Sequence, residues 1–371
     1  MLTAIVFILI LGVLIFVHEF GHFVTARRNG IKADEFGFGF PPRMFGIVKS
    51  DKTGKYRFVP GNKEVRSKNT IYSINWIPLG GFVRIKGEGG EDKEDADSFA
   101  GKPAWPRIKV LAAGVFMNFI LAWLLIAIVF MIGAPEQVDN ANGDPSAKIQ
   151  ISEVAPNSPA SAMGLQVGDE ILKNGTLNTV TDIQNYINAH KGQEIVLPVK
   201  RGSQILNLKG VPRTDAPAGE GVLGIGLAQT VIVKYSFFPA IWRGLTTMLD
   251  LLLAMIIALY GILASLVMGR GVGADVAGPV GIAVLTKQVT TLGLVYVLQF
   301  AALLSINLGI INILPIPALD GGRIMFILIE KIKGSPVTQK TEQTIHSIGF
   351  FILILLMILI TLRDVTKFFI K

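Results

Sequence analysis

The first 22 residues, MLTAIVFILILGVLIFVHEFGH (residues 1–22), join an uncharged apolar block to a cluster of ionisable side chains. As a helix, the block at residues 1–17 is nearly long enough to cross ~30 Å of hydrocarbon at ~1.5 Å per residue. It lacks the charged start and the small-residue cleavage site of a signal peptide, so we expect it to remain as a membrane span. The sequence therefore predicts a membrane helix with reactive groups near its end.

Three further uncharged blocks, residues 110–135, 288–319 and 343–362, are also long enough to span a bilayer. Hydrophobic residues make up 51% of the 371-residue chain, which is more than the core of a soluble protein of this length requires. A fifth apolar segment, residues 235–268, contains Arg243 and Asp250 and precedes a Gly-rich stretch at 269–281. Hydropathy leaves open whether this segment crosses the membrane, dips into it or lies on it.

The distribution of charge predicts the orientation. Lys and Arg side chains are concentrated between the first two blocks, which by the positive-inside bias makes that loop cytoplasmic and the N-terminus external. The net charge of +8 follows from this bias, and no aromatic-interleaved basic surface indicates nucleic-acid binding. The chain has no cysteine, so a metal would need His, Asp, Glu or carbonyl ligands.

A polar region with alternating apolar residues follows the second span. It predicts strands at 149–154, 195–201 and 204–211, a turn with a short helix at 155–165, a strand and turn at 168–175, and a helix at 181–190. Residues 147–212 resemble a PDZ domain of the bacterial type, especially in the segments SPASAMGL (158–165) and GDEIL (168–172). We expect this domain outside the cytoplasm.

His18, Glu19 and His22 form an H-E-x-x-H sequence within the first span. Helix positions i and i+4 lie ~40° apart around the axis and ~6 Å along it, so both imidazoles reach one ion. Glu19 projects beside them, where it can accept a proton from an attacking water. The alternative is a chance pentapeptide with satisfied histidines, but three ionisable groups in a membrane span are costly without a function.

A catalytic zinc site usually has three protein ligands, so a third is needed. His190 belongs to the polar domain, and His346 stands alone at the start of the last span, so neither is favoured. Asp320, at the end of an uncharged block in NILPIPALDGG (312–322), is the better candidate. Its alternative interpretation is an exposed Asp in a helix-terminating turn.

These motifs resemble the site-2 protease family of intramembrane zinc metalloproteases, in its single-PDZ bacterial form. The match extends to FGFGF (36–40), PLGGFVR (78–84) and GPVG (278–281), and covers nearly the whole chain in family order. The resemblance implies Zn²⁺ held by His18, His22 and Asp320, with Glu19 as catalytic base. It also implies that Asn312 holds the substrate backbone or the developing oxyanion, although an Asn before a Pro-rich break can equally cap exposed backbone.

The segment at residues 71–85 is too apolar for an ordinary cytoplasmic loop. It fits either a small hairpin or a sheet edge that dips toward the site and accepts an unwound substrate as an added strand. The resemblance favours the edge. The glycines of the two matching segments, Gly37, Gly39, Gly80 and Gly81, are the further candidates for substrate binding.

We therefore predict a polytopic α-helical membrane protein with four transmembrane helices, a membrane-associated β-sheet and one extracytoplasmic PDZ-like α+β domain. Residues 1–135 hold the first two spans and a membrane-dipping β region at about 36–86. The PDZ domain occupies residues 136–230, and residues 231–371 hold a membrane-associated helix and the last two spans. Because His18 and His22 lie on the cytoplasmic half, Asp320 must end an inward-running helix, so residues 235–268 should not cross an odd number of times.

The resemblance implies a protease of the bacterial inner membrane that cleaves membrane-anchored regulators such as anti-sigma factors, or remnant signal peptides. Its partners are then the lipid bilayer and membrane-protein substrates, with no nucleic acid, and the oligomeric state is left open. Two alternatives remain. A non-catalytic adaptor would use its PDZ domain to bind peptides, and a metal transporter would use the intramembrane His and Asp groups for ion passage.

Overall fold

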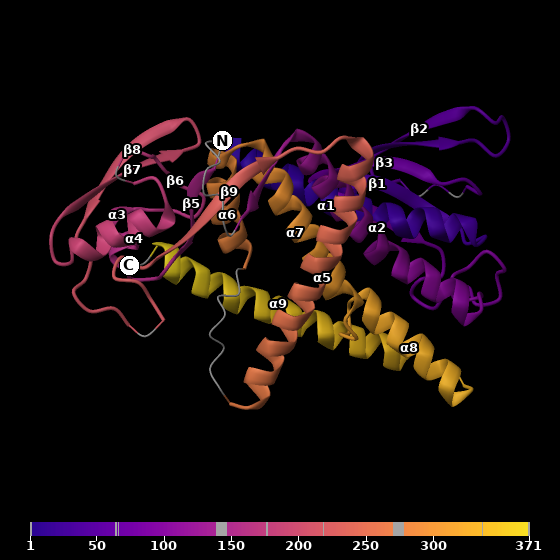
Figure 1. Ribbon diagram of the computed structural model, residues 1–371. Coiled ribbons are helices and arrows are strands. Elements are labelled where there is room, and N and C mark those ends of the chain that lie inside the picture. Colours follow the sequence, from indigo (N-terminus) through magenta and orange to yellow (C-terminus); the bar gives the residue numbers. More distant parts are fainter. Residues whose placement is uncertain are drawn as a thin grey trace. The chain divides into compact units, whose positions relative to one another are not determined.

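The computed structural model describes residues 2–63, 65, 67–138, 147–175, 177–217, 219–269, 278–335 and 337–369 (Figure 1). The chain forms two compact units. One comprises Met1–Ile126, Gly244–Lys287 and Gln299–Lys371, and the other comprises Ala127–Arg243 and Gln288–Leu298.

Five helices among the described residues are long and apolar enough to cross a membrane. They are α1 (Leu2–Arg28), α2 (Ala104–Ile132), α5 (Phe237–Val267), α7 (Leu294–Ile313) and α9 (Gln339–Phe369). Four of them coincide with the predicted spans, whereas α5 is the segment that hydropathy left open. The predicted number of four spans is therefore not confirmed. Most of the Gly-rich stretch after α5, residues 270–277, lies outside the described residues.

The end of α1 follows from its sequence. Gly30 adopts a left-handed φ of 65°, and the Ile31 N–H donates to the Ala26 carbonyl at 2.9 Å. This pattern is a Schellman cap, which a glycine adopts without a Cβ penalty. The cap turns the chain directly into the first strand, so the strand starts close to the end of the helix that carries His18 and His22.

A three-stranded sheet follows α1, in the order β2 (Tyr56–Pro60), β1 (Ala33–Lys49) and β3 (Ile71–Ile85). Its two long strands bend, because Phe36 of β1 pairs with Tyr72 and also with Val83 of β3. The first half of β1 therefore lies between the two halves of β3, and residues 81–85 of β3 form an edge. The predicted strand at 71–85 is confirmed, as part of a sheet rather than an isolated hairpin.

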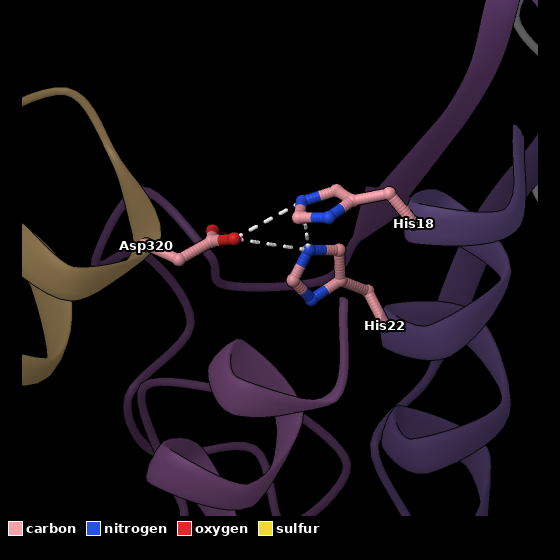
Figure 2. Close-up of side chains that lie close together, drawn as sticks. All are labelled: His18, His22 and Asp320. Atoms are coloured by element: carbon pink, nitrogen blue, oxygen red, sulfur yellow. Dashed lines mark hydrogen bonds and ion pairs between the residues drawn. The ribbon is translucent and has the colours of Figure 1, made fainter. Parts of the chain in front are cut away.

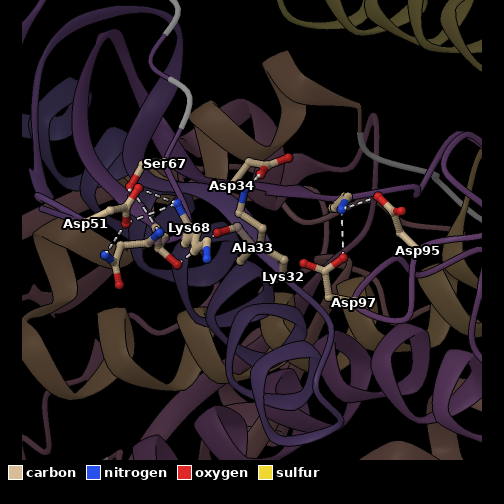
Figure 3. A network of polar contacts seen from close by, with 11 residues as sticks. Lys32, Ala33, Asp34, Asp51, Ser67, Lys68, Asp95 and Asp97 are labelled. Atoms are coloured by element: carbon tan, nitrogen blue, oxygen red, sulfur yellow. Dashed lines mark hydrogen bonds and ion pairs between the residues drawn. The ribbon is translucent and has the colours of Figure 1, made fainter.

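Polar contacts hold the loops around this sheet (Figure 3). The Asp51 carboxylate accepts hydrogen bonds from the Ser67 hydroxyl and the Lys68 backbone N–H. Beyond β3, Lys86 Nζ lies 2.5 Å from Asp95 and 2.7 Å from Asp97. Hydrogen bonds to these two carboxylates raise the pKa of Lys86 above its usual range. The Lys86 ammonium therefore stays charged, and its two ion pairs hold together the two ends of the loop at residues 86–97.

The other unit contains a six-stranded sheet in the order β4-β9-β5-β6-β7-β8. The strands are β4 (Ala134–Gln137), β5 (Lys148–Val154), β6 (Glu170–Ile171), β7 (Ile195–Arg201), β8 (Gln204–Gly210) and β9 (Ile225–Val233), with helices α3 (Pro159–Met163) and α4 (Val180–Ala189). All the strands and helices predicted between residues 149 and 211 are confirmed. The sequence did not predict β4 and β9. Whether the unit is a PDZ domain stays a prediction.

Local sequence explains α3 and α4. The Ser158 hydroxyl accepts from the Ser161 N–H and caps α3, which ends at Gly164 with a φ of 79°. Thr179 and Asp182 form a reciprocal capping box at the start of α4. The hydrogen bonds from Thr179 lower the pKa of Asp182 below its usual range. Buried Ile149, Ile151 and Ile183 belong to the core beneath these helices.

The site lies in the first unit, over a core built by four elements and the loop after β3. Ala26 of α1, Ile85 of β3, Leu111 of α2 and Ile327 of α8 (Asp320–Lys333) are all buried together with Phe99. Burial of these side chains fixes the helix ends against the sheet edge, because close-packed interiors leave little freedom for displacement. The core therefore holds the end of α1 against the start of α8.

Candidate metal centre

The two histidines of α1 face the same point, one helical turn apart (Figure 2). Their Nε2 atoms lie 3.1 Å apart, and the two residues are only 7% and 6% exposed. Two neutral ring nitrogens this close repel each other unless a proton or a cation lies between them. The two imidazoles therefore converge on one point, which a shared proton or a shared cation can occupy.

Asp320 approaches the same point from the start of α8. Its Oδ2 atom lies 3.1 Å from His18 Nε2 and 3.4 Å from His22 Nε2. The turn before it contains Pro315 and Pro317, which cannot continue a regular helix, so the chain breaks between α7 and α8. The structure thus brings Asp320 to the histidines from some 300 residues away in sequence, as predicted.

These three donor atoms fit zinc. Tetrahedral Zn²⁺ with bonds of about 2.0–2.1 Å places its ligand atoms about 3.3–3.4 Å apart. The observed triangle has edges of 3.1, 3.1 and 3.4 Å. Asp320 Oδ2 is buried and has no hydrogen-bond partner of acceptable geometry, which leaves its lone pairs directed at the same point. Within the described chain, this is the one group of three such residues that could hold a metal ion.

Both histidines are oriented by α2. His22 Nδ1 lies 2.8 Å from the Val110 carbonyl oxygen, so Nδ1 carries the proton and Nε2 is free as a ligand. His18 Nδ1 lies 3.1 Å from Asn118 Nδ2, while Asn118 Oδ1 is buried without a partner. Rotating the amide by half a turn lets Oδ1 accept the His18 Nδ1 proton, which leaves His18 Nε2 free as a ligand. Asn118 is thus the natural orienting partner of His18.

A close approach between α1 and α2 makes these contacts possible. A Cβ on Gly114 would lie 2.4 Å from His22 Nε2 and 2.7 Å from His18 Cε1. A Cβ on Gly21 would lie 2.5 Å from the Ala113 carbonyl oxygen. Sequence reasoning missed Gly114 and Asn118. The available signal was Asn118, a polar amide in an otherwise apolar span, which usually marks a functional site.

A cavity of about 180 Å³ opens beside His18, His22 and Asp320. Glu19 lines it together with the edge residues Gly81 and Val83 of β3, and Glu88 and Phe99 close it from the following loop. A Cβ on Gly81 would lie 2.8 Å from Phe16 Cα and 3.2 Å from Glu19 Cβ, so the strand packs directly on α1. The sheet edge, the glutamate and the three ligands therefore share one small space.

The other predicted substrate-binding glycines permit close packing. A Cβ on Gly37 would lie 2.2 Å from Ser73 Oγ, and one on Gly80 would lie 2.4 Å from Ile15 Cβ. Gly39 has a φ of 84°, and its carbonyl accepts from Asn75 Nδ2 at 2.7 Å. None of these three lines the 180 Å³ cavity, whereas Gly81 does.

Asn312 and the remaining histidines lie elsewhere. Asn312 is half-buried near the end of α7, and it is not among the side chains that line the cavity. His190 follows α4, where its Nδ1 lies 2.8 Å from the Tyr186 carbonyl oxygen. His346, in α9, accepts a hydrogen bond from the Ala318 N–H. Neither histidine belongs to the group of described side chains that could hold a metal ion.

Comparison with known proteins identifies the family. The model of peptidase family M50 matches residues 6–356. The regulator of sigma-W protease RasP of Bacillus subtilis (strain 168) is 30% identical, over 99% of each chain. A putative zinc metalloprotease of Clostridium perfringens is 33% identical over 96% of this chain and 97% of that protein. The zinc metalloprotease RasP of Geobacillus kaustophilus is 30% identical over 98% and 97% of the two chains.

The match runs through both motifs and everything between them, so it covers the metal centre and the six-stranded sheet alike. It confirms the predicted resemblance and the predicted reaction class, a metallopeptidase, and the relatives' names agree with the predicted zinc. The five apolar helices likewise agree with a multi-pass membrane protein. The chain belongs to peptidase family M50, the site-2 protease family.

Proposed function

We propose that the chain is an intramembrane zinc metalloprotease that hydrolyses peptide bonds within or beside transmembrane segments of other membrane proteins. The observation that carries this proposal is the triangle of His18, His22 and Asp320, in which both histidines are buried and beside which Glu19 lines a cavity. Ionisable side chains in a membrane helix carry a high free-energy cost, and they usually mark a functional site.

Each of these residues has a role in hydrolysis. His18, His22 and Asp320 would hold zinc, which when bound would supply a Lewis acid for a carbonyl and increase the acidity of water. Glu19 accepts the proton of the attacking water and returns it to the leaving amine. The Val110 carbonyl and Asn118 hold the imidazoles in the tautomer that leaves Nε2 free.

The edge of β3 is the proposed site of substrate attachment. Residues 81–85 form the outer half of the bent strand and line the cavity through Gly81, Phe82, Val83 and Ile85. An unwound segment added as a further strand would present its backbone to Glu19 and to the metal, and main-chain hydrogen bonds would bind it without demanding a sequence. Gly37, Gly39, Gly80 and Asn312 remain candidates for contacts along this path.

The proposed topology has the N-terminus outside and the metal centre toward the cytoplasm of a bacterial inner membrane. Contacts of α9 support it. Gln339 Nε2, at the start of α9, donates to the Gly89 carbonyl at 2.8 Å, beside the cavity. Asp364, near its other end, accepts from the Gly278 and Gly281 N–H groups at the start of α6 (Pro279–Leu292).

The start of α6 and the metal centre are therefore at opposite ends of α9. The chain from α6 into α7 must then run back toward Asp320. If α9 runs outward from the metal centre, α7 therefore runs inward. This direction supports our inference that residues 235–268 do not cross the membrane an odd number of times.

Single-pass regulators of the anti-sigma factor type, or remnant signal peptides, are the proposed substrates. The name of the Bacillus subtilis relative associates that protein with sigma-W. The six-stranded unit is the proposed extracytoplasmic PDZ domain, which would filter substrates by size or read a newly formed C-terminus. A cavity of about 230 Å³ between α4 and residues 221–227 offers space for a peptide end.

The test uses the full chain, purified in detergent, with a single-pass model substrate. We compare the wild type, Glu19→Gln and the wild type with a zinc chelator. Loss of the base should lower the cleavage rate by about 10²- to 10⁴-fold while zinc content stays unchanged. Cleavage that survives Glu19→Gln would refute the mechanism. Substrate capture without cleavage would favour the PDZ adaptor, and ion flux in reconstituted vesicles would favour the transporter.

A further inference from the structure

The turn between α7 and α8 holds Asp320 through an unusual backbone conformation. Ala318 has a φ of 80°, in the left-handed region that residues other than glycine seldom adopt. Asp320 follows two residues later, and Leu319, the capping residue of α8, has no side-chain cap. The conformation of Ala318 therefore sets the direction from which the Asp320 carboxylate reaches the two histidines.

A side chain from α9 holds this conformation. The Ala318 N–H donates to His346 Nδ1 at 2.8 Å. An amide in a left-handed turn cannot join a helical hydrogen-bond ladder, and it would be left without a partner here if His346 were removed. His346 thus satisfies the one backbone donor that the turn of Ala318 directs toward α9.

Packing around the ring fixes its position. The imidazole lies against the Phe326 ring of α8 with 5.3 Å between centroids. One helical turn further along α9, a Cβ on Gly349 would lie 2.5 Å from Pro317 Cβ and 2.7 Å from the Pro317 carbonyl oxygen. The absence of a side chain at Gly349 lets α9 approach the turn closely enough for His346 to reach Ala318.

We infer that His346 is a positioning residue for the metal centre: its Nδ1 acceptor holds the left-handed turn that aims Asp320 at His18 and His22. The inference rests on the proposed ligand set. His346 Nδ1 accepts the bond, so Nε2 carries the proton, and Nε2 is buried without a partner. The role of the ring therefore depends on a single atom, Nδ1.

Two substitutions of similar polarity separate that atom from the rest of the ring. In His346→Asn, the amide Oδ1 stands at the position of Nδ1, two bonds from Cβ, and can accept the Ala318 N–H. In His346→Gln, the amide reaches the position of Nε2 and leaves the Ala318 N–H without an acceptor. Both residues are neutral, and Gln is the better helix former, so general destabilisation of α9 would harm the Asn variant more than the Gln variant.

The experiment measures zinc affinity of the full chain in detergent by competition with a chromophoric chelator, together with the visible spectrum of the Co²⁺-substituted protein. We expect His346→Asn to keep the wild-type affinity and spectrum. We expect His346→Gln to weaken zinc binding on the order of 10-fold or more and to change the Co²⁺ bands, because supporting partners of metal ligands have effects of this size. Wild-type behaviour of the Gln variant, or equal loss in both variants, would overturn the inference.

Ala318→Gly provides an independent check in the same assay. Glycine adopts a positive φ without a steric penalty, so it reduces the need for His346. In the His346→Gln background, Ala318→Gly should restore most of the lost zinc affinity, and an unrestored affinity would contradict the inference. If His346→Gln alone does not fold, the double variant answers the question: near-wild-type zinc binding supports the inference and weak binding refutes it.

Zinc binding is measured without substrate, so this outcome is separate from the proposed proteolysis. A protein that binds zinc with the expected dependence on residue 346 but cleaves nothing would refute the protease proposal alone. A wild type that cleaves its substrate while His346→Gln binds zinc normally would refute the positioning role alone.

Discussion

At the scale of single residues, the metal centre depends on positions that carry no metal ligand. Gly114 leaves room for both imidazoles, and Asn118 and the Val110 carbonyl orient them. The candidate ligands come from α1 and α8, but the side chain and backbone that orient the two histidines come from α2. Correct ligand geometry is therefore a property of helix packing, and substitutions in α2 should reveal it.

Gly114→Ala is expected to weaken zinc binding by about 10- to 100-fold, because the added methyl group would stand 2.4 Å from His22 Nε2. The measurement is zinc affinity by chelator competition. Gly261→Ala in α5 is the matched control, since no atom lies within 4 Å of its added Cβ. Equal affinity in the two variants would show that α2 does not confine the histidines.

Asn118→Leu is expected to lower zinc affinity by about 10- to 100-fold, because His18 Nδ1 loses its partner. Asn118→Asp keeps an oxygen at the Oδ1 position and should preserve binding, since a carboxylate accepts the same ring proton. Zinc content after dialysis distinguishes the two variants. If Asp proves as damaging as Leu, the amide does not act through its oxygen.

At the scale of elements, a bent strand and a broken helix form the cavity. The first half of β1 separates the two halves of β3, which leaves residues 81–85 as an edge against α1. The break before α8 turns the chain so that Asp320 stands at a helix start. A straight β3 would separate the strand edge from Glu19. An unbroken helix through α7 and α8 would separate the Asp320 carboxylate from Glu19.

Gly81→Val tests the contact between β3 and α1. The new side chain would collide with Phe16 Cα and Glu19 Cβ, so the strand must move away from the glutamate. We expect cleavage of a model substrate to fall on the order of 10²-fold while zinc binding is unchanged, because small displacements at a reacting centre have effects of this size. The control is Gly261→Val in α5, where nothing lies within 4 Å of an added Cβ. Loss of zinc together with cleavage would argue against a substrate-positioning role.

At the scale of the whole molecule, the direction of each apolar helix decides on which side of the membrane the site lies. Five helices qualify as spans by length and composition, yet the meeting of His22 with Asp320 requires α1 and α7 to run in the same direction. This requirement limits the number of times that the chain between α1 and α7, which includes α5 and α6, can cross the membrane.

The absence of cysteine makes this topology directly measurable, because a single introduced cysteine is then the sole thiol. We expect Lys52→Cys, before β2, to react with a membrane-impermeant maleimide only after cell lysis. We expect Lys191→Cys, after α4, to react in intact bacterial cells with a permeabilised outer membrane. Both positions are exposed in the structure, so a lack of labelling reflects sidedness. The opposite pattern would reverse the proposed orientation.

Much of the candidate site could be predicted from short-range patterns. Two histidines four residues apart in a helix must lie on one face, because the helix has 3.6 residues per turn. Alternation likewise identified the strands from β5 to β8, because side chains alternate in a strand with a period of two. Strands β4 and β9 were missed because they lie at the margins of the polar region, beside apolar helices, where the pattern is ambiguous.

Sequence patterns alone predicted the membrane character, the placement of His18 and His22 on one helix face and, through the family resemblance, Asp320 as the candidate third ligand. Two contacts appear only in the folded chain: Asn118, 100 residues from His18, lies against its ring, and His346 accepts from the Ala318 N–H. The physical reason is range: helical period and hydropathy act over a few residues, whereas these contacts depend on how separate helices pack. The number of membrane spans also depends on tertiary structure. Length and hydropathy make α5 a candidate span, but they do not say whether it crosses the membrane.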